Sequence, residues 1–138
     1  MSRDVITSLA EGKRWVEKHL SLFNSPGVIL LSGPMGAGKT QIVRWILEAL
    51  GSKDASSPTF AIHQHYDTGN LPVDHFDLYR LNDEAELEQA GFWEALDQPD
   101  NLVLVEWADR VTITPKRRTL KIQIHPCSGD RAFEWEVL

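Results

Sequence analysis

The stretch from Val28 to Thr40 reads VILLSGPMGAGKT, and this part of the chain decides the fold. Residues 28–32 are mostly apolar and rich in branched side chains, as in a strand that is buried on both faces of a sheet. A glycine-rich loop follows at 33–38, and residues 39–50 then repeat apolar side chains at helical spacing until Gly51. A strand, a glycine loop and a helix in direct succession predict an α/β domain.

The spacing of apolar residues on both sides of this stretch predicts further helices and strands. Upstream, a helical stripe runs through residues 4–23 and ends in the turn at 24–27. Downstream, the expected elements are a strand hairpin at 60–66 and 73–79, an acidic helix at 82–90 with a continuation at 91–96, a fully apolar strand at 102–105, and strands at 120–124 and 133–137. The hairpin indicates that the sheet mixes parallel and antiparallel pairing.

The size and charge of the chain restrict its function. It has 138 residues, 42% of them hydrophobic and 25% charged, which predicts one globular domain over residues 1–138. Fourteen basic and twenty acidic residues give a net charge of −6, which argues against tight autonomous binding to duplex nucleic acid. The clustered cations Lys116, Arg117 and Arg118 are expected to form a solvated strand entry, with an anion or partner contact as the alternative.

The sequence also indicates the compartment. One cysteine, Cys127, excludes an internal disulfide, and no Cys/His spacing matches a structural zinc site. Residues 1–15 lack the apolar core of a signal peptide, and the longest apolar runs, 28–31 and 102–105, are too short to span a bilayer. We therefore expect a cytoplasmic protein with no membrane segment.

Residues 33–40 match the pattern G-x-x-x-x-G-K-[ST], which is the P-loop signature. The glycines let successive backbone N–H groups point into one concavity, which holds a polyphosphate together with the positive end of the following helix. Lys39 is expected to reach the β- and γ-phosphates, and the Thr40 hydroxyl is expected to ligate Mg²⁺. The motif and its neighbours predict a three-layer P-loop NTPase fold, of class α/β, with a mixed, mostly parallel sheet.

A P-loop site also needs a carboxylate close to the metal, normally at the end of a neighbouring strand. Glu106 directly follows the apolar run 102–105, where a buried strand emerges at the ligand-binding edge of the sheet. Asp77 lies near the end of a less apolar strand and is a second candidate, with Asp74 as a third. For each acid, the alternative is a surface residue at a strand end.

Thr59 and three histidines allow two interpretations each. Thr59 follows Pro58 in a short loop after the P-loop helix, where a hydroxyl can act as a switch toward the metal or the γ-phosphate; an ordinary turn is the alternative. His63, His65 and His75 lie in paired strands and could resemble metal ligands. Because no matched cysteine or acid set accompanies them, we expect ordinary strand residues.

Several segments, in this order, resemble the bacterial TsaE (YjeE) family, the ATPase of tRNA N6-threonylcarbamoyladenosine biosynthesis. The matching pieces are GAGKT at 36–40, SPTF at 57–60, HFDLYRL at 75–81, ELE at 86–88 with Gly91, and VEW at 105–107. Generic P-loop proteins do not carry both the HFDLYRL string and an apolar run that ends in EW.

The resemblance implies a small P-loop fold that binds ATP or ADP with Mg²⁺. It also implies ATP hydrolysis that depends on docking to TsaD and its companion TsaB. Those partners place a threonylcarbamoyl group on the adenosine next to the anticodon, and a TsaE protein drives turnover of their complex. The resemblance therefore implies a protein complex as partner, and tRNA only indirectly.

The resemblance also assigns roles to individual residues. It makes Asp77 either a metal contact or the group that orients the attacking water, and it places Trp107 beside the site, with core packing as the alternative. Tyr79 and Arg80 fall in the family motif with either a catalytic or a docking role. The expected catalytic set is Lys39, Thr59, Asp77, Glu106 and Trp107, and the expected metal set is Thr40, Asp77 and Glu106. Nucleotide contacts are expected from Gly33, Met35, Gly36, Ala37, Gly38, Lys39, Thr40 and Arg131.

The sequence departs from the family pattern in two places, and it leaves two other functions open. Pro34-Met35 stands where many members have an acidic residue, at positions whose side chains point away from the phosphates. Gly129-Asp130-Arg131 stands where the family often has Gly-Arg near the base, which makes Arg131 the expected base-side contact. The alternatives are a small-molecule P-loop kinase and a nucleotide-dependent binding module in which hydrolysis is not essential.

Overall fold

The computed structural model describes residues 2–34, 36–52, 62–114, 116–127 and 129–138. Met35, Thr59 and the side chain of Arg80 lie outside this part. In chain order the elements, including three short 3-10 turns labelled η, are β1 Ser2–Ile6, α1 Leu9–Lys18, η1 Leu20–Leu22, β2 Gly27–Ser32, α2 Lys39–Ala49, β3 His63–Asp67, β4 Pro72–Asp77, η2 Leu78–Arg80, α3 Glu84–Gln89, α4 Phe92–Asp97, β5 Leu102–Glu106, η3 Ala108–Arg110, β6 Thr119–Cys127 and β7 Asp130–Val137.

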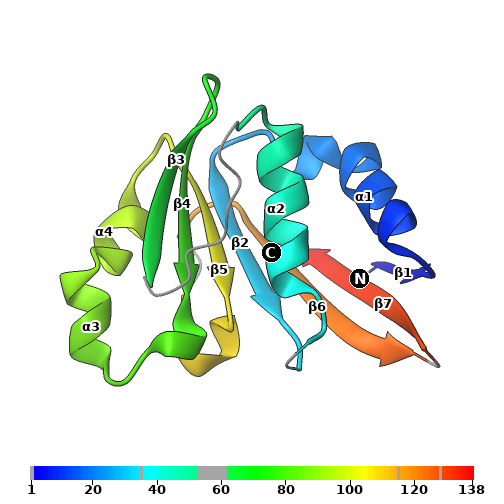
Figure 1. Cartoon of the computed structure of the whole chain (residues 1–138). Helices are drawn as coiled ribbons and strands as arrows, with labels where there is room; N and C mark the ends of the chain where they lie inside the picture. The colour runs from blue at the N-terminus through cyan, green and yellow to red at the C-terminus, as the bar shows by residue number, and fades with distance from the viewer. Residues whose placement is uncertain (1, 35, 53–61, 115, 128) are drawn as a thin grey trace.

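The strands of the described residues form a seven-stranded sheet in the order β1-β7-β6-β2-β5-β4-β3 (Figure 1). The four central strands run parallel, because β2 pairs in parallel with both β5 and β6, and β5 pairs in parallel with β4. Antiparallel partners flank them: β7 and then β1 on one side, and β3 on the other. The predicted mixed α/β sheet and its hairpin are therefore confirmed.

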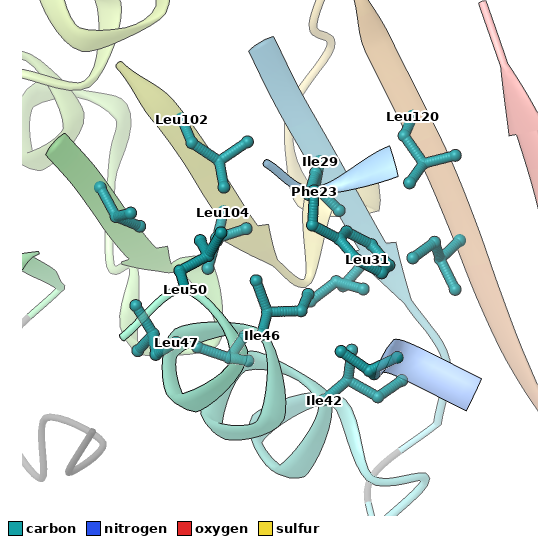
Figure 2. Close-up of a cluster of buried hydrophobic side chains, with 14 of the residues drawn as sticks. Phe23, Ile29, Leu31, Ile42, Ile46, Leu47, Leu50, Leu102, Leu104 and Leu120 are labelled. Atoms are coloured by element: carbon teal, nitrogen blue, oxygen red, sulfur yellow. The ribbon is translucent and has the colours of Figure 1, made fainter. Parts of the chain in front are cut away.

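Helices cover both faces of this sheet, which makes the fold three-layered. Alternate residues of β2 explain this arrangement: Ile29 and Leu31 belong to a core beneath α1 and α2, whereas Val28 and Leu30 belong to a second core beneath α3 and α4. Figure 2 shows the first core, in which α2 directs apolar side chains onto β2 and β5. The labelled side chains here are Ile42, Ile46 and Leu47 of α2 and Leu50, its C-cap. The apolar side chains of α2 hold this helix against one face of the sheet. Because the glycine loop follows the last residue of β2, it lies at the carboxyl edge of the sheet.

The N-terminal region differs from the sequence prediction. Residues 2–6 form the edge strand β1, paired antiparallel with β7, and α1 starts only at Leu9. Ser8 is the N-cap, since its side chain accepts a hydrogen bond from the N–H of Glu11. The helix predicted for residues 4–23 therefore starts later than expected. The strand before it could not be predicted, because its pairing partner lies near the other end of the chain and leaves no sign in the local spacing of apolar residues. Likewise β4 ends at Asp77 and a 3-10 turn follows, where the prediction extended the strand to residue 79.

The basic cluster at 116–118 is not the solvated strand entry that was predicted. Arg117 donates to the carbonyl oxygens of Ala95 and Leu96 at the end of α4 and to Oδ1 of Asn101 at 2.8 Å. Arg118 donates to the carbonyl oxygen of Leu22 at 3.0 Å. Two of the three cations therefore hold loops together at the amino edge of the sheet, far from the glycine loop.

In the described part of the chain, no helix is long and apolar enough to cross a membrane.

Candidate functional site

The loop between β2 and α2 has the backbone geometry that the glycine pattern predicts. Gly36 and Gly38 have φ values of 77° and 103°, which side chains with a Cβ rarely adopt. Gly38 is the N-cap of α2, and no side chain in the described residues caps that helix end. The first-turn N–H groups of α2 and its positive dipole end therefore face the concave side of the loop, where an anion is favoured.

Lys39 is buried at the start of α2 and folds back over this loop. Its ammonium donates to the carbonyl oxygens of Gly33 at 2.6 Å and Pro34 at 2.9 Å. It also lies 4.0 Å from the centroid of the Trp107 ring, a cation–π contact. Burial lowers the pKa of Lys39, and the nearby carboxylates of Glu106, Asp109 and Asp77 oppose this shift. Lys39 is thus a cation already withdrawn from water, next to the loop that favours an anion.

Thr40, in the first turn of α2, and Glu106, at the end of β5, are in contact at the carboxyl edge of the sheet. The Thr40 hydroxyl donates to Oε1 of Glu106 at 2.7 Å, although the two residues are 66 positions apart in sequence. Glu106 is the last residue of β5 and is buried with only 2% exposure. The described part holds no group of three or more His, Cys, Asp or Glu residues suited to a metal ion. A hydroxyl and one carboxylate fit Mg²⁺ instead, since Mg²⁺ prefers oxygen ligands and takes the remainder from water and phosphates.

Asp77 reaches the same edge of the sheet from the neighbouring strand. In the parallel pairing of β4 with β5, Asp77 is directly opposite Glu106. Its Oδ1 accepts a hydrogen bond from the N–H of Tyr79 at 3.1 Å, which starts the turn η2. A hollow of about 460 Å³ opens here, lined by Gly36, Gly38, Lys39, Thr40, Gln41, Arg44, Asp77, Tyr79, Glu106 and Trp107. The structure therefore brings together Lys39, Thr40, Asp77, Glu106 and Trp107, which were predicted from separate segments.

Asp74, the third candidate acid, does not belong to this site. It is opposite Val103, three positions back along the strand from the Asp77–Glu106 pair. Its carboxylate accepts hydrogen bonds from His63 and His65 at 2.8 and 2.9 Å and from Asn101 at 2.8 Å. Burial alone would raise the pKa of Asp74, but these hydrogen bonds and the charge of His65 hold it well below its usual range. Asp74 is thus a structural acid that ties the hairpin to the sheet.

We expect the Asp74→Asn variant to be less stable by about 2 kcal/mol at pH 7, since hydrogen bonds to charged groups contribute more than neutral ones. Because the folded-state pKa lies below the unfolded value, the ionised form stabilises the protein above about pH 4, and the contribution is lost as the pH falls below that value. Urea unfolding of both proteins at pH 7 and at lower pH measures this. An unfolding free-energy difference that does not shrink in acid would contradict it.

Trp107 is the one non-glycine residue with positive φ among the described residues, at 58°. This left-handed backbone turns the chain sharply after β5 and places the indole between Lys39 and Tyr79, whose ring centroid is 5.1 Å away. The guanidinium of Arg110 lies 5.3 Å from the Tyr79 ring. A non-glycine residue held in this region costs energy and is concentrated at functional sites. Trp107 is therefore part of the site wall, and Tyr79 is its exposed outer neighbour.

Arg131 also lies at the glycine loop. Its guanidinium donates to the carbonyl oxygen of Gly36 at 2.9 Å from the start of β7. A second hollow, of about 420 Å³, opens on this side of the loop. Its lining comes from the end of β1, the start of α1, the P-loop helix and the turn before β7: Ile6, Thr7, Ser8, Leu9, Ala37, Gly38, Gln41, Trp45, Gly129, Asp130, Arg131 and Phe133. Arg131 therefore lies beside the glycine loop, and its contact with the base stays a prediction.

Gln41 and Arg44, which line the hollow, were not predicted from the sequence, and neither was the role of His75. His75 was expected to be an ordinary strand residue, yet its Nε2 lies 2.6 Å from Oε2 of Glu106. The signal that could have revealed it is the two-residue offset between His75 and Asp77. That offset places the histidine on the same face of β4 as the acid at its end.

The fold and this edge site together define a domain of the P-loop NTPase class. Residues 6–133 match the family model described as threonylcarbamoyl adenosine biosynthesis protein TsaE, so the chain belongs to the TsaE family. It is 34% identical to the tRNA threonylcarbamoyladenosine biosynthesis protein TsaE of Haemophilus influenzae over 109 residues, which cover 78% of this chain and 68% of that protein.

Further comparisons agree with this family. The TsaE protein of Rickettsia typhi is 32% identical over 86% of this chain and 84% of its own length. For the TsaE protein of Rickettsia felis, 37% identical, the match spans only 58% of that relative's length. A crystal structure of Bacillus subtilis YdiB superposes on 97% of this chain and 83% of that protein with a TM-score of 0.73 and 26% identity. The TsaE proteins of Haemophilus influenzae and the two Rickettsia species are named for tRNA threonylcarbamoyladenosine biosynthesis, the role that the family carries.

Proposed function

We propose that this chain is a Mg²⁺-dependent ATPase that is stimulated by the TsaB–TsaD complex and drives its turnover in tRNA N6-threonylcarbamoyladenosine formation. The observation that carries the proposal is the convergence of Lys39, Thr40, Asp77 and Glu106 on one hollow at the carboxyl edge of the sheet. Membership of the TsaE family supports the pathway, and it favours an ATPase over the small-molecule kinase.

Each residue has a separate task in this proposal. The ATP or ADP phosphates would lie over the glycine loop, and the Lys39 ammonium would exchange the carbonyl oxygens of Gly33 and Pro34 for phosphate oxygens. Asp77 would accept a hydrogen bond from the attacking water and orient it toward the γ-phosphate. Thr40 and Glu106 would hold Mg²⁺, which would neutralise phosphate charge. Catalysis would then consist of positioning and charge stabilisation.

The second hollow suits the remainder of the nucleotide. It adjoins the glycine loop and combines apolar walls from Ile6, Trp45 and Phe133 with the guanidinium of Arg131. A nucleobase needs a mostly apolar slot with a few polar groups at its rim. We therefore assign the base and ribose to this hollow and the phosphates to the loop.

Three cations close to the glycine loop and the hollow already have partners in the structure, which supports dependence on a partner protein. Lys39 binds the loop carbonyls, Arg131 binds Gly36, and Arg110 lies over the rings of Tyr79 and Trp107. A transition state for phosphoryl transfer requires cations aimed at the γ-phosphate, and these three must rearrange or be supplemented. Docking to TsaB and TsaD would cause these cations to rearrange or would add a further cation. The net charge of −6 is consistent with only indirect contact with tRNA.

We expect slow ATP hydrolysis by the chain alone and a several-fold rise when TsaB and TsaD from the same source are added. Phosphate release is measured for the chain, for the partner pair and for the verified ternary mixture. Removal of Mg²⁺ with EDTA should abolish the signal in every mixture. Absence of stimulation in the ternary mixture would overturn the partner proposal, and phosphate transfer to a nucleoside, nucleotide or sugar would establish the kinase alternative.

A further inference from the structure

His75 lies inside the protein, directly behind the edge site. It belongs to β4, two residues from Val73 on the same strand face, and Val73 is part of the core beneath α2. Its side chain has 0% exposure, and its Nε2 lies 2.6 Å from Oε2 of Glu106. A polar ring therefore occupies an otherwise apolar core position and touches the acid that faces the hollow.

The carboxylate of Glu106 needs both of its oxygens satisfied. Its side chain is 2% exposed, and a buried carboxylate without hydrogen bonds is strongly disfavoured. Oε1 accepts from the Thr40 hydroxyl, and Oε2 lies against His75. One partner comes from the P-loop helix and the other from β4, so the plane of the carboxylate is fixed from two sides.

The other ring nitrogen shows which proton arrangement this requires. Nδ1 of His75 is buried and has no hydrogen-bond partner among the described residues. An unpaired acceptor is tolerated better in a core than an unpaired N–H. The geometry therefore assigns a proton to Nε2, which donates it to Oε2 of Glu106.

We propose that His75 is a positioning residue for the metal-side carboxylate: it holds Oε2 of Glu106 so that the acid and the Thr40 hydroxyl present preformed oxygen ligands to Mg²⁺. This inference rests on the proposed Mg²⁺–nucleotide function. Stability alone does not explain the His75–Glu106 contact, because well-packed apolar side chains stabilise a core as much as a buried polar pair does. His63 and His65 also contact a carboxylate, that of Asp74, but away from the hollow.

The test separates metal binding from nucleotide binding. The affinity for a fluorescent ADP analogue is measured in EDTA and across a Mg²⁺ titration, for the wild type and the His75→Leu and His75→Gln variants. Leucine fills the volume without a donor, whereas the glutamine amide can still donate toward Glu106. Loss of an outer-shell partner typically weakens metal binding about 10- to 100-fold, so we expect that loss for leucine, near-recovery for glutamine, and unchanged affinity in EDTA.

His65→Leu is the matched control, since it removes a histidine–carboxylate contact on the neighbouring strand and should leave the Mg²⁺ titration unchanged. A folded His75→Leu variant with wild-type Mg²⁺ dependence would overturn the inference. If this variant does not fold, His75→Asn, whose shorter amide falls away from Glu106, replaces it in the comparison with His75→Gln. Equal Mg²⁺ dependence of those two variants would likewise overturn it.

A second measurement does not need the nucleotide. Ring 15N chemical shifts report the tautomer of each histidine, and we expect His75 to carry its proton on Nε2 in the free protein. Glu106→Gln should shift the His75 ring signals and leave those of His65 in place. If the wild type shows no Mg²⁺-dependent nucleotide binding but these shifts are as expected, the proposed function fails while the contact stands. If His75 carries its proton on Nδ1, the positioning role fails by itself.

Discussion

The Lys39→Ala variant is expected to lose ATP hydrolysis by at least about 100-fold, the scale seen when a preorganised charge-stabilising group is removed from an active site. The physical reason is the position of the ammonium, which is buried at the first residue of α2 and faces the loop where the phosphates would lie. Burial already lowers its pKa, so binding a polyanion restores a favourable environment for the charge. Nucleotide affinity should fall together with turnover. Phosphate release in the partner-stimulated assay and titration with a fluorescent nucleotide measure the two effects.

The matched control is Lys13→Ala, which removes an exposed lysine from α1. Lys13 makes a long ion pair with Glu48, at 3.9 Å, and should tolerate the change without loss of turnover. Circular dichroism should show the Lys39→Ala variant folded, because its apolar α2 positions remain intact. Retention of full turnover would remove Lys39 from the site and, with it, the assignment of the glycine loop to phosphates.

Most of the edge site could be predicted because its residues are set by local rules. The glycine pattern fixes a loop and a helix start, and the apolar run 102–105 requires a buried strand whose next residue is Glu106. Parallel strands end at the same edge, so Asp77 and Glu106 come opposite each other once both strands are recognised. The distance between Thr40 and Glu106 therefore follows from topology, although no sequence pattern relates the two positions.

The parts that could not be predicted depend on partners distant in sequence. β1 pairs with a strand more than 120 residues away, which periodicity within residues 4–23 cannot reveal. Arg117 looks like a surface cation in a basic run, yet it binds carbonyl groups at the end of α4. His75 lies in a strand pattern like that of His63, and only the register of β4 against β5 places it behind Glu106.

The second large effect is expected for Asp77→Asn, which should lower ATP hydrolysis by about 100-fold while ATP affinity stays within about threefold of the wild type. Asparagine keeps an oxygen that can accept the N–H of Tyr79, so the turn after β4 is preserved. What disappears is the negative charge opposite Glu106 that would orient the attacking water. Asp74→Asn is the matched control, because it makes the same acid-to-amide change on the same strand, at a position away from the hollow.

This variant also separates the two nucleotide-dependent functions that remain open. If hydrolysis drives turnover of the TsaB–TsaD complex, Asp77→Asn should bind ATP and dock yet support no more than one round of tRNA modification per complex. If nucleotide binding alone controls docking, the same variant should sustain repeated modification. Counting modified tRNA per complex therefore distinguishes an ATPase from a binding module. Asp77 is suited to this test because it borders the hollow at the end of β4, directly opposite Glu106.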